Sequence, residues 1–277
     1  MSESATGHPS LELCNTLWIG QRLTGLATAC LASFVETGHA VRLYAYGPVD
    51  GVPAGVRLAD AATIVSADRL TPYLASRSYA SFSNLFRYEL LARESGMWID
   101  CDLISVRPLM AGQAHVFGYE AVKRINNAVL KLPADSPVLA DLRAVFTTPR
   151  WRPPWNDWKR NVRDYVRRAL GQDYSAVVTG PRVLTYFIEK HGLTDLTAAT
   201  DVFYPVAVHA TPNLLLPEFD IRPLITPRTS CIHLCSSYLG HRLDAGAPAG
   251  SFLAAVLDGS WRAHLPAADE KVEGRGP

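Results

Sequence analysis

The chain has 277 residues, of which 27 are Lys or Arg and 26 are Asp or Glu, so its formal net charge is +1. This balance excludes a protein that binds nucleic acid by broad phosphate neutralisation, because such proteins carry clustered excess positive charge. Hydrophobic residues make up 48% of the chain and charged residues 19%. That composition excludes a disordered chain and allows a sizeable hydrophobic core.

The sequence contains no segment that predicts a membrane span. The longest stretch without Asp, Glu, Lys or Arg, residues 202–217, is interrupted by Pro205 and Pro212, and a span needs about 20 consecutive apolar residues. Residues 1–10 are polar and lack the basic start and apolar run of a secretory signal. The five cysteines are sparse and odd in number, which favours reduced thiols. We therefore expect a cytoplasmic protein.

Strands alternate with helices over the first hundred residues, which favours an α/β fold with a mostly parallel sheet. The second half is less regular. Predicted strands cover residues 15–20, 41–46, 61–65, 97–104, 114–120, 125–132, 203–208 and 231–235. Predicted helices cover residues 23–34, 85–91, 137–146, 155–170 and 181–190.

The sharpest feature is the run Gly96-Met-Trp-Ile-Asp-Cys-Asp102. Three apolar residues predict a buried strand that ends on two carboxylates separated by one residue. In an extended chain, residues two apart point to the same side, about 6 to 7 Å from each other, so Asp100 and Asp102 can converge on one divalent cation while Cys101 faces the buried side. Hard oxygen ligands suit Mg²⁺ or Mn²⁺. Taken alone, an Asp-x-Asp tripeptide more often ends a strand and caps the next turn.

The residues around this tripeptide resemble a family of sugar transferases whose pattern is Ser-Asp-x-x-Arg-x-x-x-Leu-x-x-x-Gly-Gly-x-Tyr-x-Asp-x-Asp. The chain matches this spacing from Ser83 through Arg87 to Asp102 without a gap. The family includes α-1,4-galactosyltransferases, initiating mannosyltransferases of yeast, bacterial capsular polysaccharide transferases and the glucosyltransferase domains of large clostridial toxins. Weaker support comes from residues 17–20, 125–130 and 179–181 and from His233.

The resemblance implies a GT-A fold, in which a Rossmann-like nucleotide-binding sheet is flanked by helices and followed by an irregular C-terminal acceptor part. We therefore expect one domain over residues 13–261. Its nucleotide-sugar-binding half would cover residues 13–110 and its acceptor half residues 111–261. A flexible N-terminus (1–12) and a disordered tail (262–277) would flank it.

The resemblance also implies roles for single residues. Trp18 would stack on the nucleotide base, and Arg87 would hold phosphate or sugar oxygens of the donor. Asp102 would be the direct metal ligand, and Asp100 would contact ribose, sugar or the metal through water. The donor-binding residues are then Trp18, Ile19, Gly20, Asn84, Arg87 and Asp100, and the catalytic residues are Asp100, Asp102 and Arg87.

The chain departs from the family pattern at several positions. Asn84 stands where the family has Asp, Ser95 replaces the first Gly, and Trp98 replaces Tyr. The late family run His-x-Trp-Asn is replaced by Cys-Ile-His-Leu-Cys-Ser-Ser over residues 231–237. There, His233 is either a metal ligand or phosphate contact, or a histidine satisfied within a strand. Ser236 or Ser237 would be the polar partner.

Two further groups of residues are candidates on the acceptor side. Glu120, Asn126 and Asn127 are expected to line the acceptor or sugar site. Residues 150–168 combine seven basic residues with Trp and Tyr, which suits either a peripheral contact with an anionic membrane or a solvated helix with Trp packed into the core.

The sequence therefore favours a metal-dependent, retaining glycosyltransferase that uses Mn²⁺ or Mg²⁺. It would move a hexose from a nucleotide-sugar, UDP-galactose or UDP-glucose being favoured, to a hydroxyl of a glycan or lipid-linked glycan in bacterial polysaccharide or glycolipid synthesis, in the cytoplasm or at the inner face of the membrane. The alternatives are a metal-dependent hydrolase that uses the paired Asp, and a nucleotide-sugar-binding protein without turnover.

Overall fold

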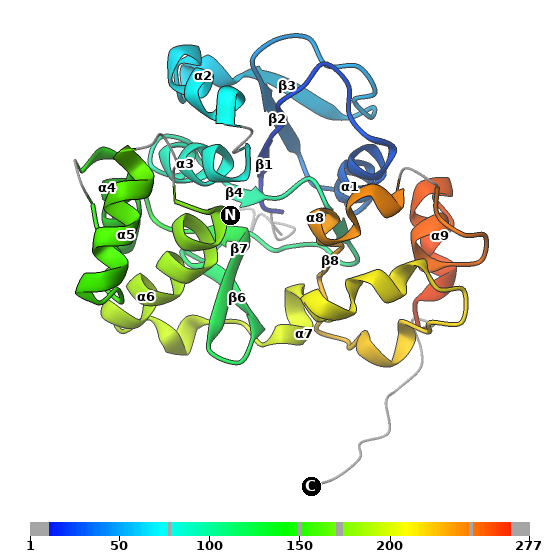
Figure 1. The fold of residues 1–277 in the computed structure, drawn as a ribbon. Helices are drawn as coiled ribbons and strands as arrows, with labels where there is room; N and C mark the ends of the chain where they lie inside the picture. The colour runs from blue at the N-terminus through cyan, green and yellow to red at the C-terminus, as the bar shows by residue number, and fades with distance from the viewer. Residues whose placement is uncertain (1–10, 77–78, 149–150, 170–173, 244–245, 267–277) are drawn as a thin grey trace, which may run out of the picture.

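The computed structural model describes residues 11–76, 79–148, 151–169, 174–243 and 246–266. A six-stranded sheet lies at its centre, with strand order β3-β2-β1-β4-β7-β6, and β5 pairs with β8 in a separate two-stranded sheet (Figure 1). The strands are β1 (Cys14–Leu17), β2 (Val41–Ala45), β3 (Val56–Asp60), β4 (Met97–Ile99), β5 (Leu103–Ser105), β6 (Val116–Ala121), β7 (Arg124–Lys131) and β8 (Cys231–His233).

The four strands β3, β2, β1 and β4 are parallel, and the β6–β7 hairpin adds to β4 in the antiparallel direction. The chain builds outward from β1 to β2 and β3, and then returns to place β4 on the other side of β1. The sheet therefore has a switch point between β1 and β4. In open α/β sheets, ligands bind beyond the carboxyl ends of the strands at such a point.

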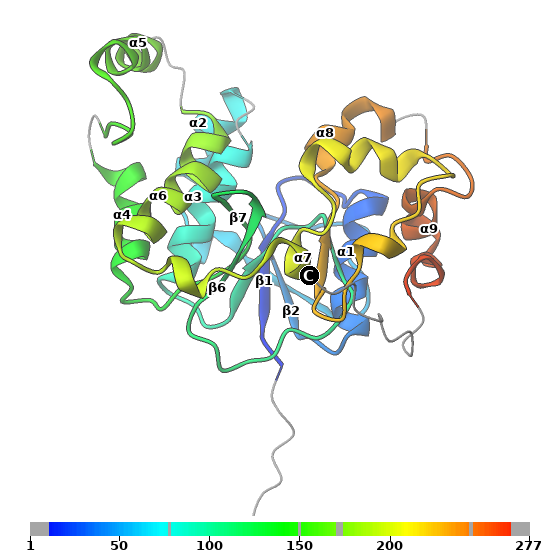
Figure 2. The ribbon, with the colours of Figure 1, turned by 90° about the horizontal axis from the view of Figure 1, so that it is seen from below.

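Helices cover both faces of the sheet. Figure 2 shows α3, α4 and α6 on one side and α1 and α9 on the other. The helices are α1 (Gly25–Glu36), α2 (Ala67–Ser76), α3 (Tyr79–Leu91), α4 (Pro137–Thr147), α5 (Trp158–Ala169), α6 (Val183–Lys190), α7 (Thr200–Phe203), α8 (Ser236–Leu239) and α9 (Phe252–Asp258). No helix among the described residues combines the length and the apolar character that a membrane crossing needs.

Helix α3 is the element that carries polar groups into the core. Its apolar residues Phe82, Phe86 and Leu90 pack in the core between the sheet and the helices on that face. Asn84 and Arg87 are buried on the same helix. Because buried polar groups are costly unless they are hydrogen-bonded, these two side chains require partners from neighbouring elements.

The predicted α/β class is confirmed, and six of the eight predicted strands and all five predicted helices have counterparts in the structure. Residues at the ends of α1 and α4 show the capping features expected of helix ends. The hydroxyl of Thr24 accepts a hydrogen bond from the backbone of Ala27 at the start of α1, and Gly38, with φ of +91°, follows the end of that helix. Pro137 opens α4, where its missing N–H costs nothing.

Two predicted strands are wrong. At 61–65 the chain forms a 3₁₀ turn, Ala61–Thr63, capped by the Asp60 carboxylate, and the strand is the preceding edge strand β3. At 203–208 the chain leaves α7 and passes into the 3₁₀ helix Val208–Leu215. Pro205, which lacks a backbone N–H, interrupts the apolar run there.

Other boundaries differ from the prediction. The strand expected over 97–104 is broken by a turn at residues 100–102 into β4 and β5, and the strand expected over 231–235 ends at His233. Helix α6 starts at Val183, after a π-helical turn at Val178–Arg182. The last residue of the helix expected over 155–170 lies outside the described residues, and α5 starts three residues later than expected. Helices α2, α7, α8 and α9 were not predicted.

The termini are ordered further than expected. Glu12 is buried and its carboxylate pairs with Lys131 at 2.7 Å, and Leu11 bridges to Met110. At the other end, Trp261–His264 form a 3₁₀ helix and Trp261 is buried. The remaining parts of the expected flexible ends, 1–10 and 267–277, lie outside the described residues.

Gly96 fixes the close approach of β4 to β1. Its φ is +98°, and a Cβ at this position would lie 2.5 Å from the carbonyl oxygen of Leu13 and 2.8 Å from the Asn15 amide nitrogen. We expect Gly96→Ala to lower the free energy of unfolding by about 3 kcal/mol, from backbone strain plus the clash. Urea denaturation measures this loss.

Gly112 is the matched control for this change. Its φ is +105°, but a Cβ there would meet nothing within 4 Å, so Gly112→Ala should cost only about 1 kcal/mol of backbone strain. Equal losses in the two variants would show that the approach of β4 to β1 imposes no steric requirement.

Candidate functional site

A cavity of about 850 Å³ opens beyond the carboxyl ends of β1 and β4, at the switch point of the sheet. Trp18 follows β1 directly and Asp100 follows β4 directly, so both strands deliver a candidate residue to this cavity. The predicted site residues that line it are Trp18, Ile19, Asn84, Arg87, Asp100, Asp102, Glu120, Asn126, Asn127, His233, Ser236 and Ser237. Gly20 is exposed and does not line it.

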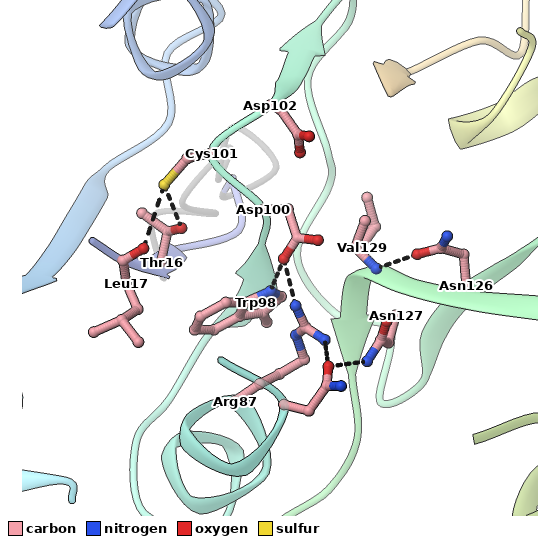
Figure 3. Close-up of polar contacts among 12 residues, drawn as sticks. Thr16, Leu17, Arg87, Trp98, Asp100, Cys101, Asp102, Asn126, Asn127 and Val129 are labelled. Atoms are coloured by element: carbon pink, nitrogen blue, oxygen red, sulfur yellow. Dashed lines mark hydrogen bonds and ion pairs between the residues drawn. The ribbon is translucent and has the colours of Figure 1, made fainter. Parts of the chain in front are cut away.

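The Asp100 carboxylate is fixed through one of its two oxygens. Oδ1 accepts a hydrogen bond of 2.6 Å from the Trp98 indole Nε1 and forms an ion pair with the Arg87 guanidinium (Figure 3). Oδ2 accepts no hydrogen bond from any described residue. Burial raises the pKa of the Asp100 carboxyl group, and the adjacent Arg87 charge opposes that rise. One oxygen is therefore held in place and the other remains available to a ligand.

The Asp102 carboxylate is held from the opposite side of the cavity. Its Oδ2 accepts a hydrogen bond of 2.8 Å from the backbone of Ser236, at the start of α8, and its Oδ1 lies 3.2 Å from Nε2 of His233. Cys235, in the left-handed region with φ of 45°, turns the chain between β8 and α8 so that this N–H points at Asp102. A short turn thus brings two late residues to the early Asp.

The protonation of this pair follows from its surroundings. Burial alone would raise the pKa of Asp102, but the His233 charge and the hydrogen bonds from His233 and Ser236 hold it well below its usual range. Burial likewise disfavours a charged His233, but the Asp102 carboxylate raises the pKa of that imidazole well above its ordinary value. Asp102 is therefore an anion, and its Oδ1 faces Nε2 of His233.

Asp100, Asp102 and His233 offer one ligand atom each, and these atoms lie within 4.8 Å of one another. The two carboxylates suit Mn²⁺ or Mg²⁺, the imidazole favours a transition metal such as Mn²⁺ over Mg²⁺, and such ions usually keep further positions for water and phosphate oxygens. The donor chemistry and the free Oδ2 of Asp100 fit a divalent cation. These three side chains are thus the residues that would hold it.

Arg87 lines the cavity, but Asp100 and its other neighbours cover most of its side chain. Its side chain is only 3% exposed, with one terminal nitrogen paired with Asp100 and the other donating to Asn84 Oδ1 at 2.7 Å. The guanidinium also stacks over the Trp98 ring, 4.7 Å from its centroid. The resemblance predicts that Arg87 contacts donor oxygens directly, but Asp100 and Asn84 already engage both of its terminal nitrogens. The contacts describe a residue that orients Asp100.

Asn84 connects this pair to two other elements. Its amide nitrogen donates to the Ala176 carbonyl at 2.9 Å and to the Thr179 hydroxyl, and its oxygen accepts from Arg87 and from Asn127 on β7. An Asp at this position, as in the family pattern, could not donate either hydrogen bond. The amide at Asn84 is therefore matched to its surroundings, and its polar atoms serve the framework of the cavity.

Trp18 forms part of the cavity wall at the end of β1. Its indole Nε1 donates to the Arg22 carbonyl at 3.1 Å, so the ring is folded back over the turn that follows. Gly20 permits this arrangement, because a Cβ there would lie 3.2 Å from that nitrogen and its φ is +147°. Gly20 thus supports the position of Trp18 without touching the cavity itself.

A second polar group lines the cavity on the β6–β7 hairpin. Glu120 is 7% exposed, forms an ion pair of 2.5 Å with Arg124 and accepts a hydrogen bond from Asn126, whose own oxygen accepts from the backbone of Ala128. Asn127 points instead toward Asn84 and Tyr88. Glu120, Arg124 and Asn126 are therefore the residues of the hairpin that can meet a ligand, and Asn127 belongs to the support of Asp100.

Cys101 separates the two aspartates and points away from the metal candidates, as expected. Its Sγ lies 3.1 Å from the Thr16 hydroxyl and 3.5 Å from the Leu17 carbonyl on β1 (Figure 3). Burial raises its pKa to about 12. The thiol is therefore neutral near neutral pH and is not a nucleophile.

Two contributors were missed from the sequence, Trp98 as a hydrogen-bond donor and Arg124. Trp98 was treated only as a buried strand residue, although its position two residues before Asp100 on the same strand places both side chains on one side. Arg124 follows Glu120 by four residues. A spacing of four predicts a side-chain pair in a helix, but these two residues lie on the two strands of a hairpin, so no signal in the sequence indicated this contact.

Comparisons with known proteins leave the family open. No known family matches the sequence, and no curated protein matches it. Among solved structures, the chain is similar to PaToxG glycosyltransferase, with a TM-score of 0.47 and 15% identity over 68% of this chain and 73% of that chain.

The Trp98–Asp100 hydrogen bond gives a direct test of the site. Trp98→Phe keeps an aromatic ring but removes the pyrrole part of the indole, including the N–H that fixes Asp100 Oδ1, so we expect the dissociation constant for Mn²⁺ to rise about tenfold. Isothermal titration calorimetry measures it. Trp155→Phe is the control, because Trp155 Nε1 has no hydrogen-bond partner among the described residues; if both variants bind Mn²⁺ like the wild type, Trp98 does not position Asp100 for a metal.

Proposed function

We propose that this protein is a metal-dependent glycosyltransferase that moves a hexose from a nucleotide-sugar to a hydroxyl group of a glycan. The observation that carries the proposal is the meeting of Asp100, Asp102 and His233 within 4.8 Å at the switch point of the sheet. The two aspartates lie in the run that matches the sugar transferase pattern, and His233 reaches them from the far end of the chain. A divalent cation bound by these three residues would attract the negatively charged diphosphate of a nucleotide-sugar.

The cavity offers each part of a nucleotide-sugar a place. Trp18 at the end of β1 presents an indole ring on which a base stacks, and UDP is the nucleotide that we favour. Asp100, Asp102 and His233 would hold Mn²⁺ or Mg²⁺, and that ion supplies the positive charge that stabilises the departing nucleoside diphosphate. Arg87 and Trp98 keep Asp100 in position.

The sugar and its acceptor are assigned to the opposite side of the cavity. Glu120, Arg124 and Asn126 provide both acceptors and donors for sugar hydroxyls, and Ser237 faces the cavity from α8. Asp100 and Asp102 are assigned to the metal, and Glu120 is paired with Arg124 and Asn126, so we assign no carboxylate of the cavity lining the role of nucleophile. The resemblance to the sugar transferases implies retention of configuration, so we assign transfer on one face of the sugar, from UDP-galactose or UDP-glucose to a glycan or a lipid-linked glycan.

The contacts of Asp102 argue against a role for this residue as the general acid of a glycosidase. A glycosidase needs one carboxyl group that is protonated and can act as general acid. Both oxygens of Asp102 are instead engaged, and its pKa lies well below its usual range. The arrangement suits a metal ligand better than an acid.

Asp102→Asn tests the proposal. The substitution keeps the shape but removes the anionic ligand, so Mn²⁺-dependent stabilisation by UDP in a thermal-shift assay should be lost. Transfer or hydrolysis of the UDP-hexose should fall about 100-fold or more. Both are measured on the same preparations, with and without Mn²⁺.

Asp135→Asn, at an exposed position outside the cavity, is the control and should behave as the wild type. Full UDP-hexose turnover by Asp102→Asn would overturn the proposal. Release of sugar from oligosaccharides, without release of UDP from UDP-hexose, would identify a hydrolase. Binding of UDP-hexose by the wild type without turnover on any acceptor would identify a binding protein.

A further inference from the structure

Helix α5 has its apolar face turned outward. Four of its large apolar residues, Trp158, Val162, Tyr165 and Val166, are 71%, 55%, 57% and 50% exposed. They recur at positions i, i+4, i+7 and i+8, so they form one stripe along the helix. In an ordinary surface helix this stripe packs on the core. Here it forms an apolar surface in contact with solvent.

The polar side of α5 contacts the segment that directly precedes the helix. Asp164 has a side chain that is only 17% exposed and accepts a hydrogen bond of 2.8 Å from Asn156. Asn161, on the same side, is half-buried. The less exposed side of this amphipathic helix is therefore polar, and its apolar side is the one that faces solvent.

The structure also separates α5 from the aromatic residues that precede it. Trp151 and Trp155 pack against the hydrophobic core, and the Arg182 guanidinium lies 4.7 Å from the Trp155 ring centroid. The expectation that the tryptophans of this segment pack into the core is thus met by these two and not by Trp158. The exposed apolar stripe is therefore confined to α5 and does not include the tryptophans that precede it.

The charges on α5 indicate what covers the stripe. Lys159, Arg160, Arg163 and Arg167 are all exposed, and Asp164 is the one acidic residue of the helix. At about 100° per residue, Lys159 and Arg163 border the stripe directly. Basic residues beside an apolar face that carries Trp and Tyr are complementary to an anionic lipid surface, where the apolar side enters the acyl boundary and the cations meet the headgroups.

We propose that α5 docks this protein on the surface of an anionic lipid bilayer, with Trp158, Val162, Tyr165 and Val166 entering the interface. In Figure 2, α5 lies at the same end of the molecule as α8, and α8 lines the cavity through Ser236 and Ser237. Docking through α5 holds the cavity near the lipid surface. The docking goes beyond the proposed function and does not depend on it.

The test is co-sedimentation of the full chain with vesicles made of equal parts phosphatidylcholine and phosphatidylglycerol, compared with vesicles of phosphatidylcholine alone. The wild type should bind the anionic vesicles and should bind the neutral ones at least about tenfold more weakly. Arg163→Gln/Arg167→Gln removes two cations, each worth about fivefold, and should weaken binding about 25-fold. Trp158→Ser should weaken it about tenfold.

The control variants carry the same kinds of change elsewhere on the surface. Arg57→Gln/Lys123→Gln removes two exposed cations away from α5, and Leu58→Ser removes a side chain that is 44% exposed; both should bind as the wild type. Circular dichroism checks that each variant is folded. Equal binding by all variants, or failure of the wild type to bind anionic vesicles, would overturn the proposal.

A second copy of the chain is the other occupant that the experiment distinguishes. Analytical ultracentrifugation without vesicles should give the same monomeric mass for the wild type and Trp158→Ser. A wild-type dimer that Trp158→Ser dissociates would show that the stripe is covered by another copy, and would also overturn docking on lipid. If the wild type binds anionic vesicles but does not turn over a UDP-hexose, the result would count against the proposed function and not against docking on lipid.

Discussion

The ion pair between Arg87 and Asp100 is the interaction on which the site depends. It joins α3 to the end of β4, and Asn84 extends it to β7 and to the backbone at Ala176. Burying a charge in this way costs several kcal/mol unless every partner is in place. Asp100 and Asn84 engage the two terminal nitrogens of the guanidinium and Trp98 stacks on it, whereas its buried Nε has no hydrogen-bond partner among the described residues. This network fixes Oδ1 of Asp100 and leaves Oδ2 without a hydrogen bond from any described residue.

The second aspartate is positioned by a different part of the chain. Asp102 leaves the same turn, but its oxygens are held by His233 and by the backbone of Ser236, more than 130 residues away in sequence. The left-handed backbone at Cys235 makes this contact possible. The two carboxylates are thus held by separate supports, one from α3 and β4 and one from the late β8–α8 turn. Removal of either support should displace one ligand without displacing the other.

The sequence predicted the sheet, most of its elements and the pairing of the two aspartates, because hydrophobic periodicity and the short spacing of Asp100 and Asp102 are local signals. It did not predict β3, an edge strand with few buried residues, or the short helices of the C-terminal part. The proximity of His233 to Asp102 was suggested by the resemblance alone. The burial of Arg87 beside Asp100 could not be read from spacing, because spacing does not reveal which partner a guanidinium takes in three dimensions.

The central claim is that one divalent cation binds between Asp100, Asp102 and His233. Anomalous diffraction from crystals of the wild-type protein soaked with Mn²⁺ and UDP tests it most directly. The account predicts a single strong manganese peak within coordination distance of both carboxylates, with the diphosphate beside it and the base against Trp18. A peak at other residues, or UDP bound with no manganese at this position, would contradict it.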